Sequence, residues 1–327
     1  MDASALRCPS CGAAVRPPSR FAREAACGFC GTVLRLDPSR VRSARYKEAF
    51  AEWETPGPAL EVGGTRWVLG ERIGRGTVAD VYRATRPRFP SERAVVKLLR
   101  LGGDLPVAAR EWATTSALAV SDAPGAPAYT RRIPEPIVCG TVSAGGWSGH
   151  HAAVYRATPG FRLSLAAVRA RPPARLAQAS LWVWRRVLEV LTFLHRAGYA
   201  HGAVAPEHVL VQDGEHGARL VGFGNAARIG SARLTVPLSP PGLFPDEGPI
   251  GPRGDVVASA RTVQWLLTGA ATTPPDVPPP YARVLRAAAG GELDDAWALR
   301  EELGAVARAA YGRPAFLPLS TPEVSHG

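Results

Sequence analysis

Two long stretches of this chain differ in how apolar and polar residues alternate. Between Thr65 and residue 157, short runs of branched and aromatic residues alternate with polar ones, a pattern typical of half-buried strands. The strands expected there span residues 65–74, 78–84, 93–101, 136–142 and 151–157. One helix interrupts this series, over residues 106–120, with Pro106 in its first turn.

From residue 158 onward, apolar residues recur at helical spacing instead. Long helices are predicted over residues 174–198, 255–269 and 293–310. Two short strands are expected at 208–212 and 218–223, and residues 228–252, rich in Pro and Gly, predict an extended surface loop. This order of elements predicts an α+β fold, with a strand-rich part at residues 65–157, a helical part at 158–311 and a flexible tail at 312–327.

Composition narrows the classes of partner. The chain has 327 residues, of which 46% are hydrophobic and 20% charged, so a sizeable core is expected. No apolar run reaches about eighteen residues and the N-terminus lacks a signal-peptide pattern, so we expect no membrane partner and a cytoplasmic location. The net charge of +11 suits nucleic acid, but the arginines form no run and do not interleave with aromatics. Nucleic-acid binding is therefore the less favoured expectation.

Four cysteines near the N-terminus form two pairs with metal-ligand spacing. They are Cys8, Cys11, Cys27 and Cys30, arranged as two CxxC pairs. A glycine follows each pair and allows the tight turn that directs backbone amides at the sulfurs. Four thiolates at this spacing enclose a tetrahedral Zn²⁺. Residues 1–36 therefore resemble a zinc ribbon in which the metal has a structural role and no catalytic one. The polar residues 37–64 predict a linker that contains a short helix.

A glycine turn, a lysine and an acid follow in this order in the strand-rich part. Gly74 and Gly76 lie between two predicted strands, and Val81 opens the second. Lys97 is one of only two lysines in a chain that otherwise uses Arg, which indicates that a guanidinium would not serve there. Glu111 is the acid on the helix that follows. Lys97 and Glu111 could position phosphates, or could form a plain ion pair between helix and sheet.

The stretch LHRAGYAHGAVAPEHVLV, residues 194–211, resembles the catalytic loop of protein kinases. In that loop a helix ends in Leu-His and a run H-R-D-L-K-P-E-N leads into a strand. His201, Pro206 and Glu207 match the run. Residues 220–224, LVGFG, resemble the D-F-G segment, and Asp255 opens a helix like the one whose leading Asp braces the catalytic loop.

With the glycine turn and the AVVK run that ends at Lys97, these motifs place residues 65–311 close to the protein kinase superfamily. The resemblance implies a bilobal fold, with a small β-rich N-lobe at 65–157 and a larger helical C-lobe at 158–311, preceded by the zinc ribbon. It also implies a candidate nucleotide site at Gly74, Gly76, Val81, Lys97 and Glu111.

The same resemblance shows what is missing. Ala203 stands at the position of the catalytic Asp and Ala205 at that of the Lys, while His208 and Gly222 replace the magnesium-binding Asn and Asp. Mg²⁺ requires oxygen ligands, and without a base or a metal the transfer of phosphate loses most of its catalysis. We therefore expect no catalytic residue, and a cleft with no carboxylate that binds a divalent ion.

The resemblance thus implies a pseudokinase that acts as a regulatory or scaffolding module and binds other proteins, such as active kinases or signalling components. Two alternatives stay open. One is a divergent Ser/Thr kinase that uses substitute acids such as Asp213 or Glu215, and the other is nucleic-acid binding through the zinc ribbon. ATP could bind without Mg²⁺, although Val95 would place extra methyl groups beside the adenine.

Overall fold

The computed structural model describes residues 6–8, 14–15, 24–28, 30–35, 57–87, 89–173, 175–212, 216–234, 240–244 and 248–319. The strand-rich part is a closed antiparallel barrel in the order β10-β8-β7-β6-β5-β9. Its strands are β5 (Ala59–Val62), β6 (Thr65–Arg75), β7 (Ala79–Arg86), β8 (Phe89–Leu99), β9 (Glu135–Ala144) and β10 (His151–Arg156). The predicted strands of this part are confirmed.

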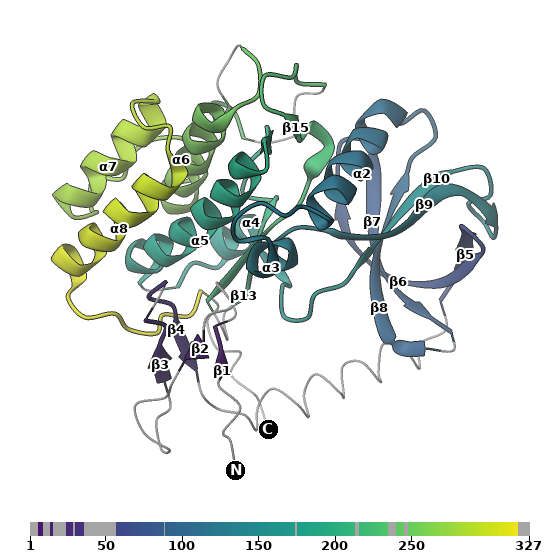
Figure 1. Cartoon of the computed structure of the whole chain (residues 1–327), viewed down its shortest axis with the longest axis horizontal. Coiled ribbons are helices and arrows are strands. Elements are labelled where there is room, and N and C mark those ends of the chain that lie inside the picture. Colours follow the sequence, from purple (N-terminus) through teal and green to yellow (C-terminus); the bar gives the residue numbers. More distant parts are fainter. Residues whose placement is uncertain are drawn as a thin grey trace.

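Alternate side chains along these strands point inward and fill the barrel, as the alternating pattern requires. Trp67 and Leu69 of β6 pack with Val96 of β8 and Val154 of β10, and all four are nearly inaccessible to solvent. Helix α2 (Leu105–Ala119) contacts β9 and β10, so its buried face covers the side of the barrel that faces the rest of the molecule (Figure 1). The barrel therefore carries Lys97 and the glycine turn on a rigid frame.

Strand β5 was not predicted, because residues 37–64 were expected to be a linker. Its four residues pair with β6 through a two-glycine turn at Gly63 and Gly64 and with the distant strand β9, which closes the barrel. A strand this short has little alternation of its own, and its second partner lies some eighty residues away in the sequence. The predicted linker helix before Gly57 lies outside the described residues.

The helical part is built around α5 (Leu176–Arg196), whose Trp184, Leu188 and Leu191 are fully buried. Helices α6 (Pro252–Thr268) and α8 (Ala296–Tyr311) pack against it, and α7 (Pro279–Gly290) packs on both. The three long helices are confirmed. Helix α7 was missed, since its Pro-rich start resembles a loop.

Shorter elements connect these parts. They are α3 (Ala126–Tyr129), η1 (Thr130–Arg132), β11 (Leu163–Ser164), α4 (Leu165–Ala170), β12 (Tyr199–Ala200), β13 (Val209–Gln212), β14 (Gly217–Leu220), η3 (Phe223–Asn225) and β15 (Ala227–Arg228). Strands β11, β13 and β14 form one small sheet, and β12 pairs with β15. The barrel and the helices lie on opposite sides of the molecule, and α3 and β15 lie between them (Figure 1).

The expectation of a flexible tail is wrong for residues 312–319. Leu317 and Leu319 are buried, and the backbone of Leu317 is hydrogen-bonded to His216 Nε2 and to the indole N–H of Trp182. The ring of His216 stacks between Trp182 and Phe316, with centroids 4.3 Å away on each side. Because the partners come from three distant segments, the isolated sequence of the tail does not indicate them. In the described part of the chain, no helix has the length and apolar character needed to cross a membrane.

Candidate functional site

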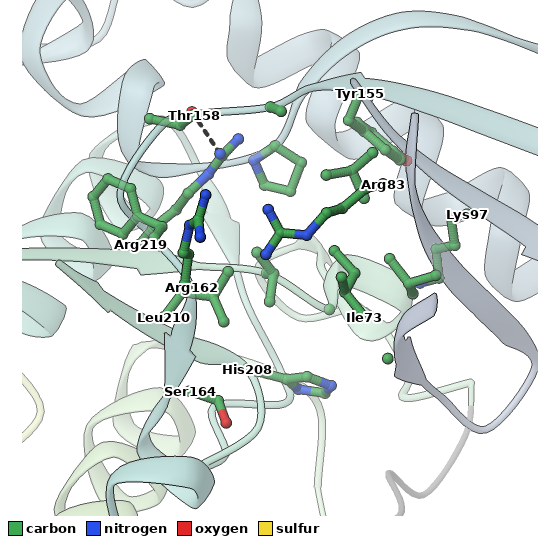
Figure 2. A pocket seen from close by; sticks show the side chains of 18 of the residues that line it. Ile73, Arg83, Lys97, Tyr155, Thr158, Arg162, Ser164, His208, Leu210 and Arg219 are labelled. Atoms are coloured by element: carbon green, nitrogen blue, oxygen red, sulfur yellow. Dashed lines mark hydrogen bonds between the residues drawn. The ribbon is translucent and has the colours of Figure 1, made fainter. Parts of the chain in front are cut away.

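A cavity of about 750 Å³ opens where the barrel meets the helical part. Its lining includes the glycine turn, Lys97, Glu111, the segment after β10, His208 and Gly222. Figure 2 shows Lys97 and His208 among the side chains around it. This volume lies in the range of small-molecule sites. The structure therefore brings the residues of the candidate nucleotide site, Gly74, Gly76, Val81, Lys97 and Glu111, to one cavity.

Lys97 and Glu111 form a salt bridge between β8 and α2 at the back of the cavity. Glu111 is only 3% exposed and Lys97 is half-buried, so the pair is shielded from solvent. Helix α2 is fixed at its start by Asp104, whose carboxylate accepts a hydrogen bond from the Val107 amide at 3.3 Å. The predicted pairing of Lys97 with Glu111 is confirmed as a contact, and it joins helix to sheet.

The glycine turn is held by an arginine of the barrel. The Gly76 amide donates to the Ala79 carbonyl at 2.8 Å, which closes the turn. Arg100 donates to the carbonyls of Gly76 and Thr77 and forms an ion pair with Asp80 at 3.2 Å. These contacts fix the turn to the residue that follows β8.

Asp255 of α6 braces the loop that resembles the kinase catalytic loop. Its carboxylate accepts hydrogen bonds from the backbone amides of His201 and Gly202, each at 2.8 Å, and lies 3.0 Å from His195 Nε2. Burial opposes ionisation of this carboxyl, but the hydrogen bonds from His195 and the His201 amide outweigh it and lower its pKa. The predicted bracing role of Asp255 is confirmed in its geometry.

His201 is a structural residue of the same loop. Its Nε2 lies 3.1 Å from the Val221 carbonyl, and its Nδ1 accepts from the Ala203 amide at 3.3 Å, so Nε2 carries the proton. Burial lowers the pKa of His201 to about 4, which keeps the ring neutral. The ring also meets Phe223 edge to face, with centroids 4.7 Å apart, and so ties the loop to the segment after β14.

No protein-family model matches the sequence, and no curated protein matches it. Solved structures do match the fold. A Toxoplasma gondii specific rhoptry antigen kinase domain superposes with a TM-score of 0.56 at 15% identity, covering 83% of this chain and 92% of that one. A rhoptry kinase from Toxoplasma gondii gives 0.55 at 16% identity, covering 83% and 90%.

A third match is ROP2 from Toxoplasma gondii, described as a virulence factor with a protein-kinase fold and no enzymatic activity. It superposes with a TM-score of 0.55 at 14% identity and covers 85% of this chain and 94% of its own. The chain has a protein-kinase-like fold. At this identity the matches establish the fold alone.

Within the kinase-like fold, His208 and Gly222 occupy a shared space. The His208 ring is held by a 2.8 Å contact between Nδ1 and the Ala203 carbonyl, and it lies against Gly222. A Cβ atom at position 222 would come within 2.4–2.6 Å of three ring atoms, and Gly222 has a φ of +78°, which favours glycine. The imidazole therefore fills the place that an Asp side chain at position 222 would need.

The other two positions at which the sequence departs from the kinase motif, Ala203 and Ala205, are buried. Ala203 is 2% exposed and Ala205 is fully buried. The position of the catalytic Asp thus carries a methyl group in the core. Ala203 and Ala205 are thus buried, whereas His208 and Gly222 line the cavity.

Two carboxylates, Glu111 and Glu207, line the cavity, and the expectation that no carboxylate there binds a divalent ion stays a prediction. Glu111 is engaged by Lys97, and Glu207 follows Pro206 along the loop. Among the described residues, however, the only group of three or more metal-type ligand atoms within 4.8 Å lies in the N-terminal module and not in the cavity. Asp213 and Glu215, the candidate substitute acids, lie outside the described residues.

The N-terminal cysteines form a metal-binding arrangement. Strand β1 (Leu6–Arg7) pairs with β2 (Ala14–Val15), and β3 (Glu24–Ala26) pairs with β4 (Val33–Arg35). The sulfurs of Cys8, Cys27 and Cys30 are buried and lie within 4.8 Å of one another. Gly31, with a φ of +69°, makes the turn in which its amide donates to the Cys27 carbonyl at 2.8 Å. The cluster can hold a metal ion, while Cys11, the fourth predicted ligand, lies outside the described residues.

The cysteine module is bound to the helical part through an arginine cluster that the sequence did not indicate. The carbonyl of Cys30 accepts hydrogen bonds from Arg300 of α8 at 2.6 Å and from Arg185 and Arg186 of α5, both at 3.3 Å. Glu189 accepts from Arg186 at 2.6 Å and from Arg300 at 3.0 Å. Arg186, Glu189 and Arg300 are at most 3% exposed, so this is a buried ionic network.

Proposed function

We propose that this protein is a catalytically inactive kinase homologue that acts by binding other proteins, in a regulatory or scaffolding role. The observation that carries the proposal is the shared space of His208 and Gly222. The His208 imidazole stands at the position of one metal ligand of kinases and fills the space that a carboxylate at position 222 would need, so neither of these two positions offers an oxygen to Mg²⁺.

The frame of a kinase supports this proposal. The Lys97–Glu111 pair, the loop braced by Asp255 and the Phe223 contact all persist, and each is a packing or positioning feature. The positions that would accept a proton or hold a metal carry Ala203, His208 and Gly222 instead. Such a chain presents the bilobal surface of a kinase without its chemistry.

The module at residues 1–36 has a structural role in this proposal. Cys8, Cys11, Cys27 and Cys30 would hold Zn²⁺ as four thiolates, and the ion would supply folding free energy to a segment with little core. The Cys30 carbonyl is hydrogen-bonded to arginines of α5 and α8, which attach the module to the helical part. The module would therefore form part of the surface that binds partners. A cytoplasmic location and partners of the class of active kinases or signalling components stay predictions of the sequence.

The test is a radiolabelled phosphate-transfer assay with Mg²⁺ or Mn²⁺ and generic protein substrates. We expect no incorporation above background, either into substrate or into the chain itself. The matched control is Lys97→Met, which removes the phosphate-binding lysine. Incorporation by the wild type that Lys97→Met abolishes would overturn the proposal in favour of a divergent Ser/Thr kinase.

A further inference from the structure

The cavity carries a cluster of cationic side chains that neither the proposed function nor the kinase resemblance requires. Its lining includes Lys97 and six arginines, namely Arg75, Arg83, Arg93, Arg156, Arg162 and Arg219. Among the described lining residues, the acids are Glu111 and Glu207. Lys97 is paired with Glu111, Arg156 with Glu135 at 2.7 Å and Arg83 with Glu71 at 3.6 Å, and cationic side chains still outnumber acidic ones in the lining.

Three of these arginines come together at the end of the cavity near the segment that follows β10. Arg83 comes from β7, Arg162 immediately precedes β11 and Arg219 comes from β14. Figure 2 shows the three side chains pointing toward the same space, between Ile73 on one side and Thr158 on the other. Like charges repel, so their convergence from three distant segments is unlike the scattered arginines of a solvated surface.

Arg219 is the buried member of this cluster. It is 6% exposed, and it is positioned by hydrogen bonds to Thr158 Oγ1 at 2.5 Å and to the Ile133 carbonyl at 2.8 Å. Its Nε is buried and has no hydrogen-bond acceptor among the described residues. Burial lowers the pKa of Arg219 to about 10, so the group is still charged at neutral pH. A buried guanidinium without a carboxylate partner is unfavourable, and a bound anion would compensate it.

We propose that this end of the cavity binds a small phosphorylated ligand directly through Arg83, Arg162 and Arg219, without a divalent metal. Guanidinium groups bind phosphate oxygens with paired hydrogen bonds, which is the geometry that three converging arginines offer. Apolar side chains of Val95 and Leu210 line the same cavity and suit the organic part of such a ligand. The proposal does not depend on whether the chain transfers phosphate.

The test uses inorganic pyrophosphate as the probe, measured by isothermal titration calorimetry in buffer depleted of divalent cations. No chelator is added, so that a metal bound to the cysteines is retained. We expect saturable binding that weakens by about tenfold or more in Arg83→Gln and in Arg162→Gln, because each removes charge-assisted hydrogen bonds. Both side chains are at least partly exposed, so these variants are expected to fold.

The matched control is Arg283→Gln, which makes the same change of charge at an exposed side chain of α7, away from the cavity. It is expected to change the affinity less than twofold. An equal loss in Arg283→Gln would show a general effect of net charge and would overturn the proposal. A requirement for added Mg²⁺, or the absence of binding by the wild type, would also overturn it.

A second set of probes defines the ligand class. Glycerol phosphate, which carries one phosphate ester on an uncharged body, is expected to compete with pyrophosphate, whereas glycerol is not. Arg219→Lys keeps the charge but loses the fork geometry, and it is expected to weaken binding if it folds. Competition by glycerol at the same concentration as glycerol phosphate would contradict recognition of phosphate.

Discussion

At the scale of single residues, His208 and Gly222 are coupled through space. The imidazole and a side chain at position 222 cannot both be present, because the ring atoms lie 2.4–2.6 Å from where a Cβ would be. A change at either position therefore alters what the other can hold. This coupling gives a test that does not depend on activity.

Gly222→Ala is expected to lower the free energy of unfolding by about 2–4 kcal/mol, from the clash with His208 added to backbone strain at positive φ. In a His208→Ala background, only the strain of about 1–2 kcal/mol should remain. A double-mutant cycle by urea denaturation measures the difference. The control is Gly230→Ala, where φ is +91° and no atom lies within 4 Å of the added Cβ. Additive effects of the two changes would contradict the packing described here.

Two buried histidines make stability depend on pH. Burial lowers the pKa values of His201 and His216 to about 4. In the unfolded chain each takes up a proton near pH 6.5, so between about pH 6.5 and pH 4 the unfolded state binds more protons. Their contribution to stability is therefore fully present above pH 6.5 and is lost as the pH falls toward 4.

We expect the free energy of unfolding to decrease over this range, and to decrease less steeply in His216→Phe. That variant keeps an aromatic ring between Trp182 and Phe316 and removes one titrating group. Chemical denaturation at several pH values measures both slopes. Above pH 7 the difference between variant and wild type should be constant, which serves as the internal control. Equal slopes in the two proteins would contradict the assignment of His216.

At the scale of secondary-structure elements, the arginine cluster joins α5 and α8 to the cysteine module. Glu189 holds Arg186 and Arg300 in place, and their guanidinium groups are directed at the Cys30 carbonyl. A module of this size has little core of its own, so its stability should depend on these contacts as well as on its metal.

Arg300→Met is expected to destabilise the protein by about 3–5 kcal/mol, because it leaves the buried carboxylate of Glu189 with one partner fewer. It should also speed the loss of zinc to a chromogenic chelator. Arg283→Met, at an exposed side chain of α7, is the control for both measurements. Unchanged zinc release in a folded Arg300→Met protein would show that the module does not depend on this contact.

Sequence patterns predicted those elements whose periodicity is strong. Helix α5 and the strands β6, β7 and β8 carry long apolar repeats, so their positions could be deduced without the fold. Strand β5 and the packing of residues 312–319 depend on partners far away in the sequence, which no local pattern records.

The residues of the candidate site also differ in whether the sequence could predict them. Lys97, Glu111 and Asp255 could be predicted because each lies within a motif with fixed spacing. Arg83, Arg162 and Arg219 belong to no motif, and arginine is too common in this chain for any single one to be noticed. Their convergence follows only from the arrangement of β7, β11 and β14.

At the scale of the whole molecule, the fold keeps the frame of a kinase and changes the charge of its cleft. The Lys97–Glu111 pair joins β8 to α2, and Thr114 of α2 donates a hydrogen bond at 2.7 Å to the Ala226 carbonyl next to β15. The metal-binding positions are lost and the cavity is rich in arginine. This combination is what the two proposals rest on, namely protein binding without phosphate transfer and anion binding without Mg²⁺.

A thermal-shift titration with ATP, in the presence and absence of Mg²⁺, tests the loss of the metal site most directly. The account predicts that any stabilisation by ATP is the same with and without Mg²⁺, since His208 and Gly222 offer the ion no oxygen ligand at the two metal-binding positions of kinases. The control is Mg²⁺ alone, which should not change the melting temperature. A melting temperature that rises with ATP only when Mg²⁺ is present would contradict the account.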